Sequence, residues 1–229
     1  MRSEIADRLA AVRRQVDEAA CGCGRDPSLV TLIAVGKTFP AEVVNQAVEV
    51  GATDLGENRV QEAAAKKPEV AEARWHLIGP LQRNKARAAL EVFDIVHTVD
   101  RLEIADRLQY LLREHWPDRQ LEVLLEVNLA AELQKAGVLP EDAGELLEHV
   151  LGLDQLVVRG LMAIPPWEED PEVSRPWFRQ LRELRDQLED EAGCPLPELS
   201  MGMSHDFEIA VAEGATMVRV GTAIFGPRG

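Results

Sequence analysis

Residues 30–50, VTLIAVGKTFPAEVVNQAVEV, contain the pattern that decides the fold. They begin with a short apolar run, VTLIAV, and continue after Pro40 with apolar residues at helical spacing. Proline suits the first turn of a helix, and Gly51 suits the position just after its end. Strands that alternate with helices in this way predict a parallel sheet with right-handed crossovers.

Seven further apolar runs extend the pattern along the chain. The eight predicted strands are VTLIAV (30–35), TDLGE (53–57), WHLIG (75–79), DIVHTVD (94–100), LEVLLEVN (121–128), VVRGLMAIP (157–165), ELSMGMS (198–204) and MVRVGTAIFG (217–226). An open doubly wound sheet would show the same alternation. Eight units preceded by an amphipathic helix favour an α/β fold of the (β/α)8 TIM-barrel type with one extra N-terminal helix.

Shorter signals agree with this architecture. Asp100 is expected to cap a helix that begins at Arg101. Gly51-Ala52-Thr53 recurs as Gly214-Ala215-Thr216, which suggests that one helix-to-strand turn is used twice. Residues 165–177, PPWEEDPEVSRPW, are long enough for a loop over the barrel mouth but too short to separate two domains. We therefore expect residues 1–229 to form a single domain.

The composition excludes several classes of protein. The chain has 25 basic and 40 acidic residues, a net charge of −15, which argues against nucleic-acid or anionic-membrane binding. Three cysteines make no disulfide framework, and Cys21 and Cys23 have no matching Cys or His pair for zinc, so we expect no metal site. The N-terminal segment lacks the apolar core of a signal peptide, and a cytoplasmic monomer is expected.

Lys37 is the most informative candidate for chemistry. It directly follows an apolar strand, whereas the other lysines lie in polar helix ends or in a loop. Partial desolvation there would lower the pKa of the amine, and a neutral amine condenses with an aldehyde. A strand-end lysine that simply reaches solvent is an equally good interpretation of position alone. Gly36-Lys37-Thr38 is no phosphate-binding P-loop, since Thr31 stands where the motif needs glycine.

The last two strands predict a phosphate site, which barrels often form in the loops after strands seven and eight. Ser204 is expected to open a helix, where it would act as an N-cap, as a phosphate ligand or as both. Gly221 and Thr222 offer backbone N–H groups and a hydroxyl. Arg219 lies on the same side of its strand as Gly221 and would be buried, so it needs either an internal ion partner or a ligand.

Six segments together resemble one known family. The chain is similar, from about Leu32 to Arg228, to the YggS/PROSC family of pyridoxal 5′-phosphate (PLP) homeostasis proteins. The segments that carry the resemblance are AVGKTFP, DLGENRVQE, WHLIGPLQRNK, HTVDR, RGLMAIP and LSMGMSHDFEIAVAEGATMVRVGTAIFG. It departs from the family pattern at Gly36, Arg59 and His205, where serine, tyrosine and an acidic residue are common.

The resemblance implies a PLP barrel of fold type III, like the N-terminal domain of alanine racemase. It implies that Lys37 carries PLP as a Schiff base and that Arg219 faces the pyridine nitrogen. It further implies that Asn58 contacts the cofactor ring, that Lys135 lies near the site, and that the phosphate is held by Ser204, Gly221 and Thr222.

Two functions follow from this resemblance. The first is a PLP carrier with little or no turnover, which takes part in PLP homeostasis and delivers the cofactor to PLP-requiring apo-enzymes. The alternative is a PLP-dependent amino-acid enzyme of racemase or decarboxylase type. Racemases of this type take a second base, a tyrosine, from a further C-terminal domain; the only tyrosine here is Tyr110, in a predicted helix. We therefore expect the carrier. A PLP-free aldolase using Lys37 would fit the phosphate site but not the resemblance.

Overall fold

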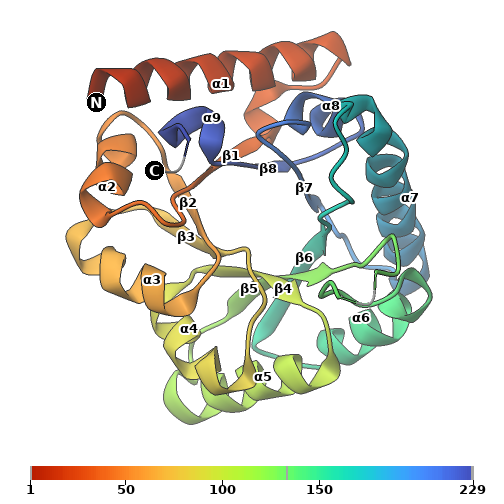
Figure 1. Ribbon diagram of the computed structural model, residues 1–229. Coiled ribbons are helices and arrows are strands. Elements are labelled where there is room, and N and C mark those ends of the chain that lie inside the picture. Colours follow the sequence, from red (N-terminus) through yellow and green to blue (C-terminus); the bar gives the residue numbers. More distant parts are fainter. Residues whose placement is uncertain (1, 133, 228–229) are drawn as a thin grey trace.

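Eight parallel strands close into a barrel in the computed structural model, which describes residues 2–132 and 134–227. Each strand pairs with the next, and β8 pairs with β1 through Thr31 and Met217, which closes the ring (Figure 1). The strands are β1 Thr31–Val35, β2 Asp54–Glu57, β3 Arg74–Leu77, β4 Ile95–Val99, β5 Leu121–Glu126, β6 Leu156–Met162, β7 Glu198–Met203 and β8 Met217–Val220. The closed barrel confirms the predicted fold class.

Helices surround the barrel and alternate with its strands (Figure 1). Those that follow strands are α2 Ala41–Glu49, α3 Val60–Lys66, α4 Ala86–Val92, α5 Leu102–His115, α6 Ala143–Leu151, α7 Arg175–Ala192, α8 Phe207–Ala212 and α9 Thr222–Phe225. The extra helix α1, Arg2–Gly22, precedes β1 and lies outside α8 and α9. Among the described residues, no helix is both long and apolar enough to cross a membrane.

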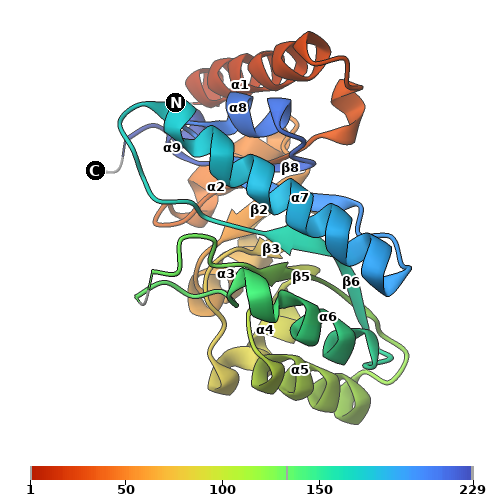
Figure 2. The same ribbon diagram turned by 90° about the vertical axis from the view of Figure 1, so that its right-hand side faces the viewer.

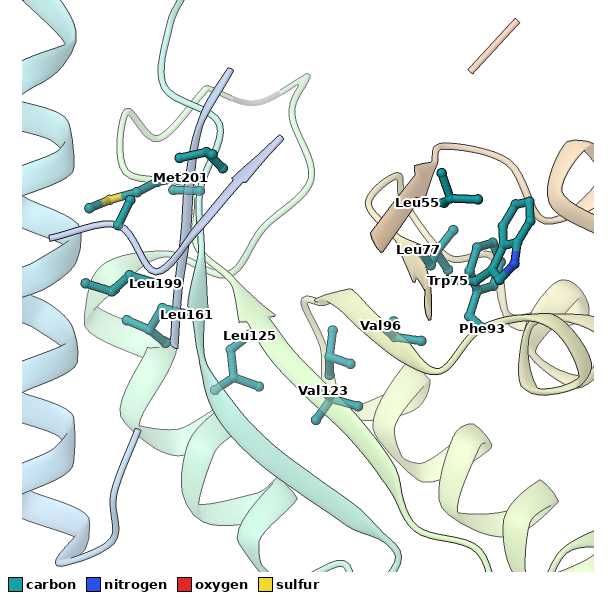
Figure 3. Close-up of a cluster of buried hydrophobic side chains, with 14 of the residues drawn as sticks. Leu55, Trp75, Leu77, Phe93, Val96, Val123, Leu125, Leu161, Leu199 and Met201 are labelled. Carbon is teal, nitrogen blue, oxygen red and sulfur yellow. The ribbon is translucent and has the colours of Figure 1, made fainter. Parts of the chain in front are cut away.

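Most of the core lies between the strands and the helices. Side chains at alternate strand positions point outward into it, and Figure 3 shows part of this layer: Leu55, Trp75, Leu77, Phe93, Val96, Val123, Leu125, Leu161, Leu199 and Met201. Each fully buried aliphatic side chain of this kind contributes about 1.5–3 kcal/mol relative to an exposed one. The helices are thereby fixed around the strands.

The interior of the barrel is smaller and more polar. One apolar layer fills it, made by Ile33, Ile95, Leu124, Met162 and Met217. Two residues further along several strands, the same inward-facing side carries polar groups instead: His97 after Ile95, Glu126 after Leu124 and Arg219 after Met217. The interior therefore becomes polar towards the ends of the strands, where a barrel places its functional site.

The repeated Gly-Ala-Thr segment forms the same turn twice, as the sequence suggests. Gly51 and Gly214 have φ angles of 111° and 112°, a conformation that glycine adopts easily and other residues rarely do. In each case the alanine N–H closes back on the preceding helix, Ala52 on Ala47 at 2.9 Å and Ala215 on Ala210 at 2.8 Å.

Three local predictions are wrong. Strand eight ends at Val220, because Gly221 leaves the extended conformation (φ −112°, ψ −76°), and residues 222–225 form α9. Asp100 does not cap α5: Arg101 occupies the N-cap position, and the Asp100 carboxylate pairs with the Arg101 guanidinium instead. Pro40 is the N-cap residue of α2 and precedes its first turn.

The longest connections leave the barrel on the side where the strands end. In Figure 2 the segments between β5 and α6 and between β6 and α7 extend from that side. The second of them contains most of the predicted loop, with a short 3₁₀ helix at Pro171–Ser174 before α7 begins at Arg175. This end of the barrel is therefore surrounded by these two long segments as well as by the ends of the strands.

Candidate functional site

One cavity of about 230 Å³ lies at the end of the barrel where the strands finish. All six residues predicted for the site line it: Lys37, Asn58, Ser204, Arg219, Gly221 and Thr222. They come from β8 or from the segments just after β1, β2, β7 and β8, four strands that are consecutive around the barrel. The structure thus brings the six together; their roles towards a cofactor remain predictions.

A tight turn presents Lys37 to the cavity. The Phe39 N–H donates to the Gly36 carbonyl at 3.1 Å, so the chain reverses directly after β1. Thr38 in this turn has φ 71°, an unfavourable conformation for a β-branched residue that costs about 1–3 kcal/mol. Gly36 has no room for a side chain, since a Cβ there would lie 2.7 Å from Cγ2 of Val44. The packing of α2 against the turn accounts for glycine at this position.

Lys66 holds this turn in place by a hydrogen bond to its backbone. Its ammonium donates to the Gly36 carbonyl at 2.9 Å and to Oε1 of Glu57 at 2.6 Å, and both charged side chains are buried. The sequence places Lys66 in a polar helix end; it does end α3, but the ion pair lets it lie inside. Burial raises the pKa of Glu57, and Lys66 partly offsets the effect. Glu57 also interacts electrostatically with Lys37.

Arg219 forms part of the cavity wall and is only 3% exposed. Its guanidinium donates to the Ser200 hydroxyl at 2.6 Å and to the Ala163 carbonyl at 3.0 Å. These partners are neutral, so the internal ion pair considered for Arg219 is not formed among the described residues. Burial lowers the pKa of Arg219 to about 10, which leaves it a cation at neutral pH. Two of its five N–H groups make these hydrogen bonds, and the side chain also lines the cavity.

Glu126 is a second buried charge near Arg219. Its side chain points into the barrel at the end of β5, and Oε2 has no hydrogen-bond partner. Burial, together with repulsion from Asp100, raises the pKa of Glu126 to about 7, against the attraction of Arg219. This carboxyl therefore titrates near neutral pH, although sequence position alone gave no reason to single it out.

Ser204 links the loop after β7 to the start of α9. Its hydroxyl oxygen accepts from the N–H groups of Gly221 at 3.2 Å and Ala223 at 3.5 Å. The prediction that Ser204 opens α8 is wrong, because α8 begins at Phe207 with Asp206 as the preceding residue. Gly221 packs closely on β1, and a Cβ there would lie 3.2 Å from the Val35 carbonyl oxygen. Ser204, Gly221 and Thr222 thus form one compact polar corner of the cavity.

Asn58 contributes a buried acceptor that lacks a partner. Its side-chain Oδ1 makes no hydrogen bond, and such a group costs about 1–3 kcal/mol unless a ligand satisfies it. The backbone of Asn58 lies so close to Gly79 that a Cβ on Gly79 would be 2.3 Å from the Asn58 carbonyl oxygen. The cavity therefore offers a ligand an amine, a cationic donor and an unpaired amide oxygen, which fits the functional groups of PLP.

Two other residues named from the sequence lie elsewhere. Lys135 does not line the cavity, and its ammonium pairs with the Glu132 carboxylate in the loop after β5. Tyr110 lies on α5 with 56% of its surface exposed and does not line the cavity either. Neither side chain supplies a second acid–base group to the site as it stands.

Sequence reasoning missed the apolar part of the cavity wall. Trp167 is 73% exposed, and its ring centroid lies 6.1 Å from that of His205 at the rim, with the two rings tilted by 30°. His205 Nε2 lies 3.0 Å from the Glu169 carbonyl oxygen. The remaining apolar lining residues are Val35, Phe39, Ile78, Ile164 and Met203. Only the loop prediction for residues 165–177 pointed to this region.

Comparison with known proteins agrees with this geometry. The model of the family "Alanine racemase, N-terminal domain" matches residues 8–229. The pyridoxal phosphate homeostasis protein of Aquifex aeolicus is 44% identical over 224 residues, which cover 97% of each chain. The solved structure of PipY from Synechococcus elongatus PCC7942 with PLP bound superimposes with a TM-score of 0.86 at 42% identity, covering 97% of this chain and all of that one.

A more distant comparison concerns the fold alone. An alanine racemase of Clostridium difficile, solved in complex with cycloserine, superimposes with a TM-score of 0.73 at 14% identity. The match covers 94% of this chain but 59% of the racemase. The barrel is thus shared with a much longer enzyme.

Proposed function

The chain belongs to the family of pyridoxal phosphate homeostasis proteins built on the alanine racemase N-terminal domain, and on that basis we propose that it binds PLP and takes part in intracellular PLP homeostasis. We further propose that it works as a single-domain cytoplasmic monomer with little or no catalytic turnover. The observation that carries the proposal is the cavity that Lys37 shares with Arg219 and Ser204.

Each residue has a distinct part in this proposal. Lys37 would hold PLP through the aldehyde of the cofactor, as a Schiff base. Arg219 donates an N–H to the pyridine nitrogen, and Asn58 contacts the ring. The polar corner of Ser204, Gly221 and Thr222 holds the phosphate. PLP itself supplies an aldehyde that reacts reversibly with amines.

Release uses the same bond in reverse. Water or an incoming amine would displace the Lys37 amine, so PLP held in this way would be exchangeable. Lys66 and Glu57 keep the supporting turn in place, so Lys37 returns to the same position after each exchange. The proposed acceptors are PLP-requiring apo-enzymes.

The competing function is that of an amino-acid racemase or decarboxylase. A racemase needs acid–base groups on both faces of the substrate carbon. Lys37 can serve one face, but Tyr110 is exposed on α5 and outside the cavity. Arg219 also remains protonated and donates to the ring without transferring a proton readily, which weakens the ring as an electron sink. The missing second base is the stronger argument for a carrier, because functional racemases also use an arginine at the ring nitrogen.

Absorbance spectroscopy tests the cofactor and its attachment. PLP added to the purified chain is expected to produce a band in the violet region that sodium borohydride abolishes. Lys37→Ala should lack this band, whereas Lys85→Ala, which changes a lysine outside the cavity, should keep it. A wild-type chain without the band in excess PLP would overturn the proposal.

Two further assays separate carrier from enzyme. The PLP-loaded chain should restore activity to a PLP-requiring apo-enzyme, and it should not racemise or decarboxylate amino acids at a measurable rate. Failure to reactivate any apo-enzyme tested would contradict delivery. Turnover that disappears in Lys37→Ala would instead establish the enzyme.

A further inference from the structure

Five polar side chains form a continuous hydrogen-bonded line across the barrel interior. His76 Nε2 lies 2.9 Å from Oδ1 of Asp54, and His76 Nδ1 lies 2.9 Å from His97 Nε2. His97 Nδ1 lies 2.9 Å from the Ser200 hydroxyl, which accepts from Arg219 at 2.6 Å. The residues belong to β2, β3, β4, β7 and β8, so the line runs from the start of β2 to the cavity.

This line is shielded from water over nearly all its length. His76, His97 and Ser200 are 0% exposed, Arg219 is 3% exposed, and the Asp54 side chain is 14% exposed. A buried polar group that loses its partner costs about 1–3 kcal/mol. Each member therefore depends on its neighbours for a partner inside an otherwise apolar layer.

The two ends of the line determine where every proton lies. An arginine can only donate hydrogen bonds, and an ionised aspartate can only accept them. With both imidazoles neutral, His76 must keep its proton on Nε2 for Asp54, so its Nδ1 can only accept. His97 then donates from Nε2 to His76 Nδ1, and His76 donates from Nε2 to Asp54. His97 Nδ1 therefore accepts from the Ser200 hydroxyl, and no other arrangement of two neutral imidazoles gives all five groups a partner.

The surrounding charges agree with two neutral imidazoles. Burial lowers the pKa of His76, against the attraction of Asp54 and Asp94, and Arg74 lowers it further. Burial also lowers the pKa of His97 well below its usual value, as do His76, Arg219 and Arg74. Burial alone would raise the pKa of Asp54, but hydrogen bonds from His76 and Thr53 outweigh it, so the carboxyl stays ionised.

We propose that Asp54, His76, His97 and Ser200 are positioning residues that hold the Arg219 guanidinium in a fixed orientation beneath the cavity. The Ser200 hydroxyl and the Ala163 carbonyl hold two corners of the guanidinium, and the side chain also lines the cavity. The link to a cofactor rests on the proposed function, in which Arg219 faces the pyridine nitrogen. The proton arrangement itself depends only on this chain.

Histidine-selective ¹⁵N NMR of the full chain without PLP tests that arrangement directly. The chain has only five histidines, so His76→Gln and His97→Gln suffice to assign the two signals. Both imidazoles should be neutral at pH 7 with the proton on Nε2, because burial lowers the pKa of each. A proton on Nδ1 of either ring, or an imidazolium at pH 7, would overturn the proposed arrangement of protons along the hydrogen-bonded line.

PLP titration followed by absorbance then tests the effect on Arg219. His97→Leu removes both hydrogen bonds and should raise the dissociation constant about tenfold, the equivalent of about 1.4 kcal/mol. His97→Gln, whose amide both donates and accepts, should recover part of the affinity. Leu124→Val is the control in the adjacent apolar layer of the barrel interior and should bind as wild type does. Equal affinities for His97→Leu and Leu124→Val would refute the positioning role.

The two measurements fail separately from the proposed function. If the imidazoles have the expected protons and the chain binds no PLP, the proton arrangement of the hydrogen-bonded line stands and the cofactor proposal falls. If PLP binds as expected but the imidazole protons lie elsewhere, the cofactor proposal stands and the proposed proton arrangement falls. A His97→Leu variant that does not fold leaves the NMR result and His97→Gln to decide.

Discussion

Replacing Lys66 by methionine removes the cation of the buried pair and leaves the Glu57 carboxylate without its partner. The wild-type ammonium lies 2.6 Å from Glu57 and 2.9 Å from the Gly36 carbonyl, and both side chains are less than a tenth exposed. Removing one member of a buried ion pair costs about 3–5 kcal/mol. Methionine recovers some packing, so we expect a loss of about 3 kcal/mol in the free energy of unfolding.

The loss should depend on pH in a defined direction. Burial raises the pKa of Glu57 even with Lys66 present, and without Lys66 it should rise further. Protonation then removes the unpaired charge, so Lys66→Met should be less destabilising at pH 5 than at pH 8. Near neutral pH the loss corresponds to a fall in Tm of roughly 6–12 °C.

Urea denaturation of four variants measures this coupling. Lys66→Met, Glu57→Gln and their combination form a double-mutant cycle, and Lys85→Met controls for loss of a lysine outside the site. The double variant should be more stable than Lys66→Met, because it leaves no unpaired charge at positions 57 and 66. A Lys66→Met variant within about 0.5 kcal/mol of wild type at pH 8 would refute the reasoning.

Three further predictions follow from the residues around the cavity. The pKa of Glu126 is raised from 4.5 to about 7, so it stabilises the fold fully below its unfolded pKa and loses that contribution as pH rises through about 7. Glu126→Gln should flatten the pH dependence of urea stability and be more stable than wild type at pH 8 by about 2 kcal/mol; parallel pH curves would contradict this. Gly36→Ala should cost about 1–2 kcal/mol in thermal or urea unfolding, and less in a Val44→Ala background, where the close contact is gone; equal costs in both backgrounds would exclude that contact as the cause. Thr38→Asn should raise the free energy of unfolding by about 1 kcal/mol, because asparagine adopts a positive φ more readily, and a destabilised variant would show that the threonine side chain matters more than backbone strain.

The sequence predicts the barrel well, because short apolar runs between helical stretches report local conformation. Each of the eight runs overlaps one strand, and Lys37, Asn58 and Ser204 meet because they follow strands that end on the same side. Position after a strand is a property that the chain shows locally. This is why the candidate cavity residues could be gathered before the fold was known.

Contacts between distant strands were beyond that reasoning. His97 and Ser200 are 103 positions apart and meet only because the barrel closes, so the local sequence around either residue gives no sign of the contact. Lys66 looked like a polar helix end, since nothing in its neighbourhood reveals the partner on β2. Ser204 accepts hydrogen bonds from the start of α9 and does not open α8, because the loop after β7 folds towards β8. These details depend on tertiary packing.

Peptide mapping after borohydride reduction tests directly whether Lys37 is the residue that carries PLP. The purified chain is loaded with PLP, reduced, digested and examined by mass spectrometry for a pyridoxyl phosphate group on lysine. We expect the pyridoxyl phosphate group on Lys37 alone at stoichiometric loading, and no labelled peptide from Lys37→Ala. Stoichiometric label on another lysine, or none on the wild-type chain, would contradict it.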